Sequence, residues 1–376
     1  MKNQIISTRN YISHKAYISI LKPILFKFDA EAVHDLFIKT GRSLGKFAIT
    51  QKIAGVLWSY KNSSLEQNIS GINFKNPIGL AAGFDYEGSL TQILPSVGFG
   101  LETVGTITNG SYEGNAKPRL GRLIKSKSLL VNKGFKNLGM EQTIKRVKGS
   151  HFKIPVGLSI GVTNTSTLAN QNEAILDIVK AFETAENSGI PFSYYELNIS
   201  CPNLQVSMEF YSPQNLEDLL KAVTYKKLSK PLFIKMPIDK TNVEVISMFE
   251  VIIKYPIAGV IFGNLQKNKL DLSLDQSEVS RFTKGNFSGK PTEKRSNELI
   301  SFAYKAYGTK LIIVGCGGVF SAEDAYKKIK LGASLVQMIT GMIFEGPQVI
   351  SDINLGLAKL LKADGYKNIS EAIGKK

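Results

Sequence analysis

The sequence contains only two cysteines, Cys201 and Cys316, among its 376 residues. Two cysteines give no disulfide framework, so we expect a reducing compartment. Long apolar runs are also absent: the most apolar N-terminal stretch, 16–28, is too short to cross a bilayer and contains Lys22 and Pro23. No apolar segment leads to a small-residue cleavage site, so no signal peptide is expected. No metal-ligand set is predicted.

Acidic residues are few relative to basic ones, 31 against 47, which gives a net charge of +16. The lysines are mostly isolated, and no basic run is interleaved with aromatic residues, so nucleic acid is not a predicted partner. Residues 1–61 are denser in charge, with ten Lys/Arg against three Asp/Glu. A basic, partly apolar N-terminus is typical of a protein that binds the surface of an anionic membrane, and we expect peripheral association.

The first 62 residues are predicted to be helical. Apolar residues recur at three-to-four spacing over 15–28 and 30–47, and Asp29 is the expected N-cap of the second helix, with Glu31 in its first turn. The pattern changes after this point. We therefore divide the chain into a helical extension, 1–62, and a catalytic domain, 63–376.

From about residue 65, short apolar runs that end in small or polar residues alternate with amphipathic segments. Continuous apolar strands indicate burial on both faces, and hence a parallel sheet with helical crossovers. Eight such units predict a (β/α)8 TIM barrel. An open doubly wound sheet is the alternative, although no G-x-G-x-x-G follows the first strand. The strands are expected at 78–82, 100–106, 155–161, 194–200, 232–236, 258–264, 310–315 and 334–340, and helices at 173–188, 215–224, 242–254, 296–307 and 322–331.

The carboxyl ends of barrel strands converge on one face, where functional residues are expected. The segment 196–203 (ELNISCPN) places Cys201 between asparagines at the end of the fourth strand. From these residues alone, Cys201 is either a general base or a buried, inert thiol. Glycine-rich segments after the seventh and eighth strands, 315–318 and 339–341, predict a phosphate-binding site to which 288–289 could contribute another donor.

Four motifs together resemble the dihydroorotate dehydrogenase family over nearly the whole chain: 76–85 (NPIGLAAGFD), 114–120 (GNAKPRL), 198–203 (NISCPN) and 315–341. The helical extension resembles that of the membrane-associated, quinone-dependent class. The resemblance implies FMN as cofactor, oxidation of dihydroorotate to orotate in pyrimidine biosynthesis, and a membrane quinone as electron acceptor. In a bacterium, the implied location is the cytoplasmic face of the cell membrane.

The resemblance also implies roles for individual residues. Cys201 would be the base that takes a proton from the substrate, and Lys235 would lie beside the flavin. Asn198, Asn203 and Asn264 would bind the substrate, and His34 and Arg122 would line the quinone passage. The flavin would be held by Ala81, Ala82, Gly83, Gly105, Thr106, Asn198, Lys235, Ser288, Gly289, Gly317, Gly318, Thr340 and Gly341.

The sequence departs from the family pattern mainly in the expected pocket. Tyr86 stands where the family motif Phe-Asp-Lys-Asn-Gly has lysine, and Val131 replaces a substrate-binding asparagine. Three further departures are Ser159 for Asn, Leu265 for Thr and Ile339 for Tyr.

Three other residues bear on the chemistry. Lys133 or Lys136 would restore a cation for the substrate carboxylate. Cys201 replaces the serine usual in the quinone-dependent class, and a free thiol pKa of about 8.5 suggests that it needs less help to act as a base. Two alternatives stay open: an FMN oxidoreductase with another substrate, and a non-catalytic flavin-binding paralogue.

Overall fold

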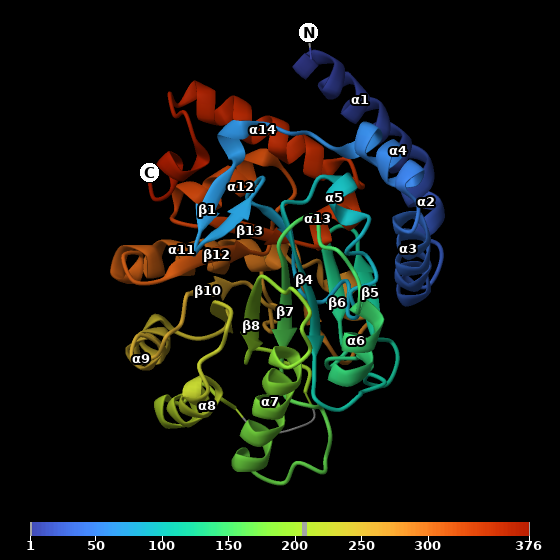
Figure 1. The fold of residues 1–376 in the computed structure, drawn as a ribbon. Helices are drawn as coiled ribbons and strands as arrows, with labels where there is room; N and C mark the ends of the chain where they lie inside the picture. Colours follow the sequence, from blue (N-terminus) through green and yellow to red (C-terminus); the bar gives the residue numbers. More distant parts are fainter. Residues whose placement is uncertain (1, 205–208, 376) are drawn as a thin grey trace.

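Eight parallel strands close into a barrel in the computed structural model, which describes residues 2–204 and 209–375 (Figure 1). The TIM-barrel prediction is confirmed, and closure excludes the doubly wound alternative. Each predicted run overlaps one barrel strand, and the predicted and observed ends differ by at most two residues. In hydrogen-bonded order the strands are β10 (Gly259–Phe262), β12 (Ile312–Cys316), β13 (Leu335–Met338), β3 (Ile78–Leu80), β4 (Leu101–Ile107), β7 (Val156–Ile160), β8 (Tyr194–Asn198) and β9 (Leu232–Met236).

Amphipathic helices cover the outside of the barrel because each must bury its apolar face against the sheet. The five predicted crossover helices are present, with ends shifted by up to three residues. They are α7 (Gln171–Glu186), α8 (Pro213–Tyr225), α9 (Asn242–Ile252), α11 (Glu293–Tyr307) and α12 (Ala322–Lys330). The other helices after the extension are α5 (Leu94–Val97), α6 (Met140–Val147), α10 (Gln276–Val279), α13 (Thr340–Glu345) and α14 (Val349–Ala363).

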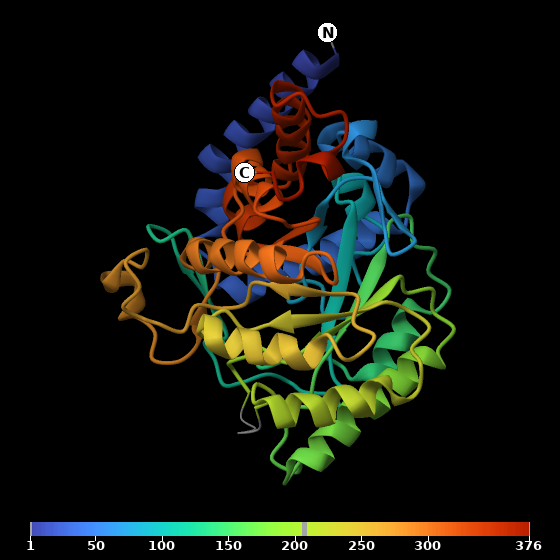
Figure 2. The same cartoon turned by 90° about the vertical axis from the view of Figure 1, so that its left-hand side faces the viewer.

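The N-terminal extension is helical, as predicted, but its first helix starts earlier than expected. Helix α1 (Lys2–Ala16) continues through a π-helical turn, Tyr17–Leu21, into α2 (Lys22–Leu25), so the start predicted at residue 15 is wrong. Asp29 caps α3 (Ala30–Gly45) by accepting a hydrogen bond from the Ala32 amide at 2.9 Å. Helix α4 (Ala48–Trp58) completes the extension. The four helices lie along one side of the barrel, next to α14 and the strand β5 (Figures 1 and 2).

Two small antiparallel sheets were not predicted. One is the hairpin of β1 (Gln67–Ile69) and β2 (Ile72–Phe74). The other has the order β11-β6-β5, formed by β11 (Asn286–Phe287), β6 (Ser128–Val131) and β5 (Leu120–Leu123). The second sheet matters for the site, because β5 contacts α3 and so joins the extension to the barrel mouth.

Within the described residues, no helix is long and apolar enough to cross a membrane.

Candidate active site

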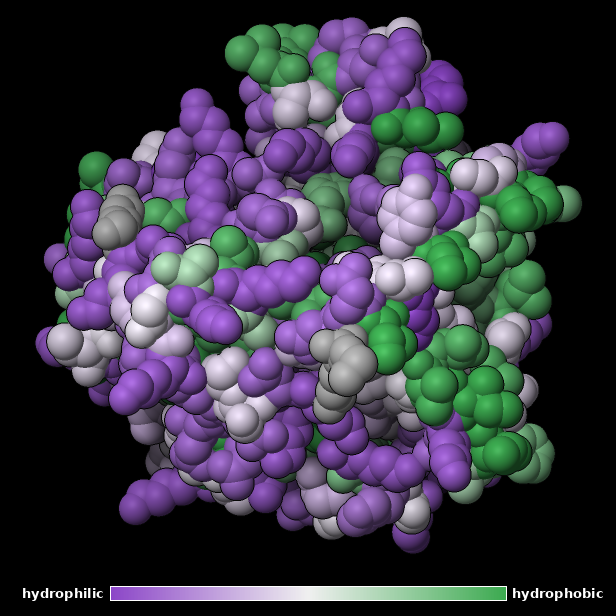
Figure 3. Space-filling view, turned by 90° about the horizontal axis from the view of Figure 1, so that it is seen from above, coloured by the Kyte–Doolittle hydropathy of each residue, from purple (hydrophilic) through white to green (hydrophobic). Residues whose placement is uncertain are grey.

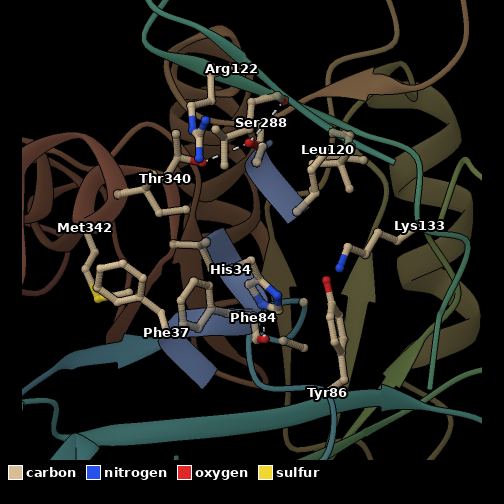
Figure 4. Close-up of a pocket in the computed structure, with 18 of the residues that line it drawn as sticks. His34, Phe37, Phe84, Tyr86, Leu120, Arg122, Lys133, Ser288, Thr340 and Met342 are labelled. Carbon is tan, nitrogen blue, oxygen red and sulfur yellow. Dashed lines mark hydrogen bonds between the residues drawn. The ribbon is translucent and has the colours of Figure 1, made fainter. Parts of the chain in front are cut away.

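A cavity of about 260 Å³ runs from the N-terminal helices to the carboxyl ends of the barrel strands. Its outer part is lined by apolar side chains of α2 and α3 and by the small antiparallel sheet. Its inner part is lined by polar groups, among them Asn198, Cys201, Asn203, Lys235 and Asn264. The structure therefore brings together the base, amide and lysine candidates predicted from sequence, and Figure 4 shows the outer wall of the same cavity.

The turn after β8 holds Cys201 between two fixed amides. The Asn198 side chain donates to Thr106 Oγ1 at 2.8 Å and accepts from the amide of Ser200 at 3.2 Å. Asn264, at the end of β10, donates to the Ser200 carbonyl at 2.7 Å. Because both asparagines bind the residue before Cys201, they fix the backbone that carries the thiol.

Asn203 is fixed from three sides. Its side-chain amide donates to the Val131 carbonyl at 3.0 Å and accepts from Asn286 at 2.7 Å, while its own carbonyl accepts from Asn115 at 2.9 Å. The segment after β8 is thereby attached to both β6 and β11. Sequence reasoning did not identify Asn115 or Asn286 as support for this residue.

The thiol of Cys201 lies in an environment that opposes its ionisation. Burial raises the pKa of Cys201 to about 11, although the Asn203 backbone amide, Lys235 and Lys267 act in the other direction. Desolvation therefore offsets part of the advantage that the low intrinsic pKa gives a thiol over a hydroxyl as a base. A base role requires that a small thiolate fraction carries the reaction.

A second cavity of about 100 Å³ adjoins the first and shares Ala82, Lys235 and Asn264 with it. Small residues make up most of its wall. Gly317 and Gly318 have φ angles of 98° and 69°, which favour glycine, and a Cβ on Gly317 would lie 2.3 Å from Thr292 Oγ1. The wall also carries the hydroxyls of Ser288 and Thr340, whose oxygens lie 2.9 Å apart.

The chemistry of this second cavity fits the phosphate and ring of FMN. Backbone close approach, two hydroxyls and the buried ammonium of Lys235 together suit an anionic, planar ligand. Of the predicted flavin residues in the described chain, Gly105 alone lines neither cavity. Gly105 instead supports a lining residue, because its carbonyl accepts a hydrogen bond from the Gly83 amide at 2.7 Å. Lining the cavities are the other predicted flavin residues: Ala81, Ala82, Gly83, Thr106, Asn198, Lys235, Ser288, Gly289, Gly317, Gly318, Thr340 and Gly341.

His34 and Arg122 both line the outer part of the cavity, as predicted (Figure 4). His34 Nε2 lies 2.8 Å from the Phe84 carbonyl, and its Nδ1 lies 3.2 Å from Asp35. The Arg122 guanidinium donates to the Phe28 carbonyl at 2.7 Å and lies 4.6 Å from the centre of the Phe26 ring. Both side chains thus connect the N-terminal helices to the barrel mouth.

The departures from the family pattern fall in the same place. Tyr86, Val131, Leu265 and Ile339 all line the larger cavity. Ser159 does not: it is fully buried, with its hydroxyl 2.9 Å from that of Thr106. Four of the five substitutions therefore change the wall that a ligand would touch.

Two acidic residues with no role predicted at the site help to build it. Glu196, one layer below Asn198, accepts from Thr103 at 2.7 Å and Gln337 at 2.6 Å, and burial raises its pKa although Lys235 acts in the opposite direction. Glu31 of α3 is buried against cations of the barrel loops. From sequence, Glu31 is placed only in the first turn of a helix, and nothing in the sequence pattern indicates this contact.

The closed barrel, the polar site at its strand ends and the adjoining glycine-rich cavity define an enzyme of the (β/α)8-barrel class. Comparison with known proteins is more specific. The family model described as Dihydroorotate dehydrogenase matches residues 64–361. The chain therefore belongs to the dihydroorotate dehydrogenase family and is an oxidoreductase.

Individual relatives agree with this assignment. A protein from Trichodesmium erythraeum is 34% identical, over 95% of this chain and 98% of its own. One from Christiangramia forsetii is 36% identical, over 90% and 97%. Both are named Dihydroorotate dehydrogenase (quinone). A crystal structure of DHODH from Eimeria tenella in complex with ferulenol superposes with a TM-score of 0.80 at 25% identity, covering 93% of this chain and 98% of that one.

Proposed function

We propose that this protein oxidises dihydroorotate to orotate with bound FMN and passes the electrons to a quinone, as a step of pyrimidine biosynthesis. One observation carries the proposal: a single cavity connects a polar inner site to an apolar outer passage between the N-terminal helices and the barrel. An enzyme with a water-soluble acceptor would not need an apolar passage, whereas the ring and tail of a quinone do.

The residues of the inner site have different proposed roles in the reaction. Cys201 takes a proton from the substrate carbon that faces it, while Asn198, Asn203 and Asn264 orient the planar substrate through amide hydrogen bonds. FMN held in the glycine-rich cavity would supply the hydride acceptor. Lys235 lines both cavities, so its ammonium would favour negative charge where the two ligands meet. The apolar walls keep bulk water away from the proton transfer.

The outer passage is the proposed quinone site. Apolar side chains such as Phe26, Val33 and Phe37 surround it, and His34 and Arg122 supply polar contacts for the quinone carbonyls. Residues 1–62 are then a quinone- and membrane-binding extension of the catalytic domain 63–376.

We further propose that the extension binds a membrane surface. Its helices expose many large apolar side chains, and a hydrophobic patch is visible on one side of the molecule in Figure 3. Basic residues of the same segment would contact anionic lipid head groups. The exposed apolar side chains are Ile5, Tyr11, Ile12, Ile20, Leu21, Ile24, Phe28, Leu36, Phe37, Phe47, Ile49, Ile53, Val56 and Leu57.

A spectroscopic experiment tests the function. The purified protein should show flavin absorbance that bleaches when dihydroorotate is added without oxygen and returns when a short-chain quinone is added. A flavin spectrum that stays that of the oxidised form after dihydroorotate is added would contradict the proposal. It would favour a family member with a different substrate, which is the second candidate because Tyr86 and Val131 alter the cavity wall.

A further inference from the structure

Three cations from the barrel loops meet one carboxylate from the N-terminal extension. Glu31 Oε2 lies 2.9 Å from Arg119 Nε, and Glu31 Oε1 lies 3.3 Å from both Lys133 Nζ and Lys136 Nζ. The side chains of Glu31 and Lys133 are only 6% and 4% exposed, whereas that of Lys136 is 32% exposed. Asp35, half exposed, is the other acidic group that acts on Lys133.

The cluster holds more positive than negative charge. Glu31 stays ionised, because although burial alone would raise its pKa, Lys133, Arg119 and Lys136 hold it below the usual value. One buried carboxylate and one half-exposed carboxylate face three cations. A buried excess of positive charge is costly unless an anion compensates it.

Lys133 is the member of the cluster with capacity for a ligand. Among the described residues, the only polar contact of its ammonium is with Glu31 Oε1, at 3.3 Å. An ammonium has three donors, so at least two remain. Lys133 lines the cavity and lies 4.7 Å from the centre of the Tyr86 ring, where Figure 4 shows it directed inward. Arg119 and Lys136 do not line the cavity.

The other two cations on the cavity wall, Arg122 and Lys235, lie in other parts of the cavity. Arg122 is at the outer end, against the Phe28 carbonyl and the Phe26 ring. Lys235 is shared with the glycine-rich cavity. Lys133 lines the larger cavity but not the glycine-rich one, and its ion pair with Glu31 leaves donors of the ammonium for a ligand.

We propose that Lys133 binds the carboxylate of the substrate and is the residue that makes the site specific for an anionic pyrimidine. Glu31 positions this ammonium from the N-terminal extension, and Tyr86 forms the apolar floor beneath it. The inference rests on the proposed function, since it takes dihydroorotate and orotate as the ligands of the inner site.

The test compares orotate with orotamide, its uncharged analogue of nearly the same shape, by titrating the FMN-loaded protein and following the flavin spectrum. The wild-type protein should prefer orotate by about 10- to 100-fold, which is the range expected for a charge-assisted hydrogen bond. Lys133→Met should reduce this preference to within about threefold of unity. Lys133→Arg, which keeps the charge, should retain most of it.

Lys136→Met is the matched control, because it also removes a partner of Glu31 but no group from the cavity wall. Its orotate preference should stay within about threefold of wild type. Flavin content and thermal unfolding identify a misfolded variant, and Lys133→Gln then serves as the smaller polar replacement. The proposal is overturned if Lys133→Met or Lys133→Gln retains the wild-type preference, or if Lys136→Met loses it equally. If the FMN-loaded wild type binds neither ligand, the proposed substrate is wrong as well.

Discussion

Cys201 gives the sharpest kinetic prediction. Burial raises the pKa of its thiol to about 11, and the ordinary value is 9.0. A shift of about two units corresponds to ~2.7 kcal/mol against the thiolate. At pH 7 the thiolate fraction is therefore ~10⁻⁴, and it rises about tenfold per pH unit until it approaches the pKa.

If the thiolate is the base, the rate of flavin reduction follows this fraction. In stopped-flow experiments without oxygen, with saturating dihydroorotate, the rate constant should increase by two to three orders of magnitude between pH 7 and pH 10. The rate constant should increase with pH because a base acts only when it is deprotonated. The raised pKa means that the Cys201 thiol is almost fully protonated at neutral pH. Substrate affinity should fall towards pH 10, because burial lowers the pKa of the Lys133 ammonium, so dihydroorotate must be kept saturating at each pH.

Substitutions separate Cys201 from other ionising groups. Cys201→Ala should slow flavin reduction by about 10²- to 10⁴-fold while FMN stays bound, because a general base contributes this much. Cys201→Ser should be slower than wild type at every pH and show no plateau near pH 11, since a hydroxyl ionises at much higher pH. A flat wild-type profile, or an unchanged rate in Cys201→Ala, would refute the assignment of Cys201 as base.

Three further predictions follow from the site and the extension. Glu31→Gln should lower the free energy of unfolding by about 2–3 kcal/mol in denaturant titrations, because three cations lose their counter-charge. Since the folded pKa of Glu31 is lowered, the wild-type advantage should be fully present above about pH 4.5 and be lost as the pH falls through the folded pKa; an advantage that does not decrease below pH 4.5 would contradict this. Gly317→Ala should lower FMN affinity at least tenfold in fluorescence titrations, whereas Gly365→Ala, with φ of 80° but no atom within 4 Å of a Cβ, should not; equal effects would mean that backbone strain alone is responsible. Ile53→Asp should weaken sedimentation with anionic vesicles, and Leu272→Asp, an exposed apolar site outside the extension, should leave it unchanged; the reverse order would place the membrane contact elsewhere.

The barrel could be predicted closely because burial on both faces leaves a clear trace in the sequence. Strand β9 (Leu232–Met236) is apolar except for Lys235 and buried throughout, and its predicted and observed bounds agree. The small sheet of β5, β6 and β11 left no such trace. Its strands have two to four residues and are partly exposed, so neither length nor alternation distinguishes them from loops.

The same difference governs the site. Cys201, Lys235 and Asn264 lie at strand ends, so the barrel topology brings them together and the sequence could place them. Lys133 and Lys136 lie in a loop, where side-chain direction depends on the backbone. Gly134 and Phe135 between them have left-handed φ angles of 66° and 65°, and this turn separates a lysine that lines the cavity from one that does not. Spacing alone carries no information about such a turn.

The contact of Glu31 with Lys133 makes the N-terminal extension part of the proposed substrate site and not only a cover for the proposed quinone passage. Glu31 belongs to α3, which also carries His34 and Phe37 into the outer cavity. A displacement of α3 would therefore change both the apolar passage and the position of the ammonium proposed to bind substrate. The carboxylates of the substrate and of Glu31 would share one cation, so each weakens the hold of the other on Lys133. A ligand that binds in the outer cavity and holds α3 in place would therefore change the affinity for substrate. Because linked equilibria are reciprocal, substrate would change the affinity for that ligand by the same factor.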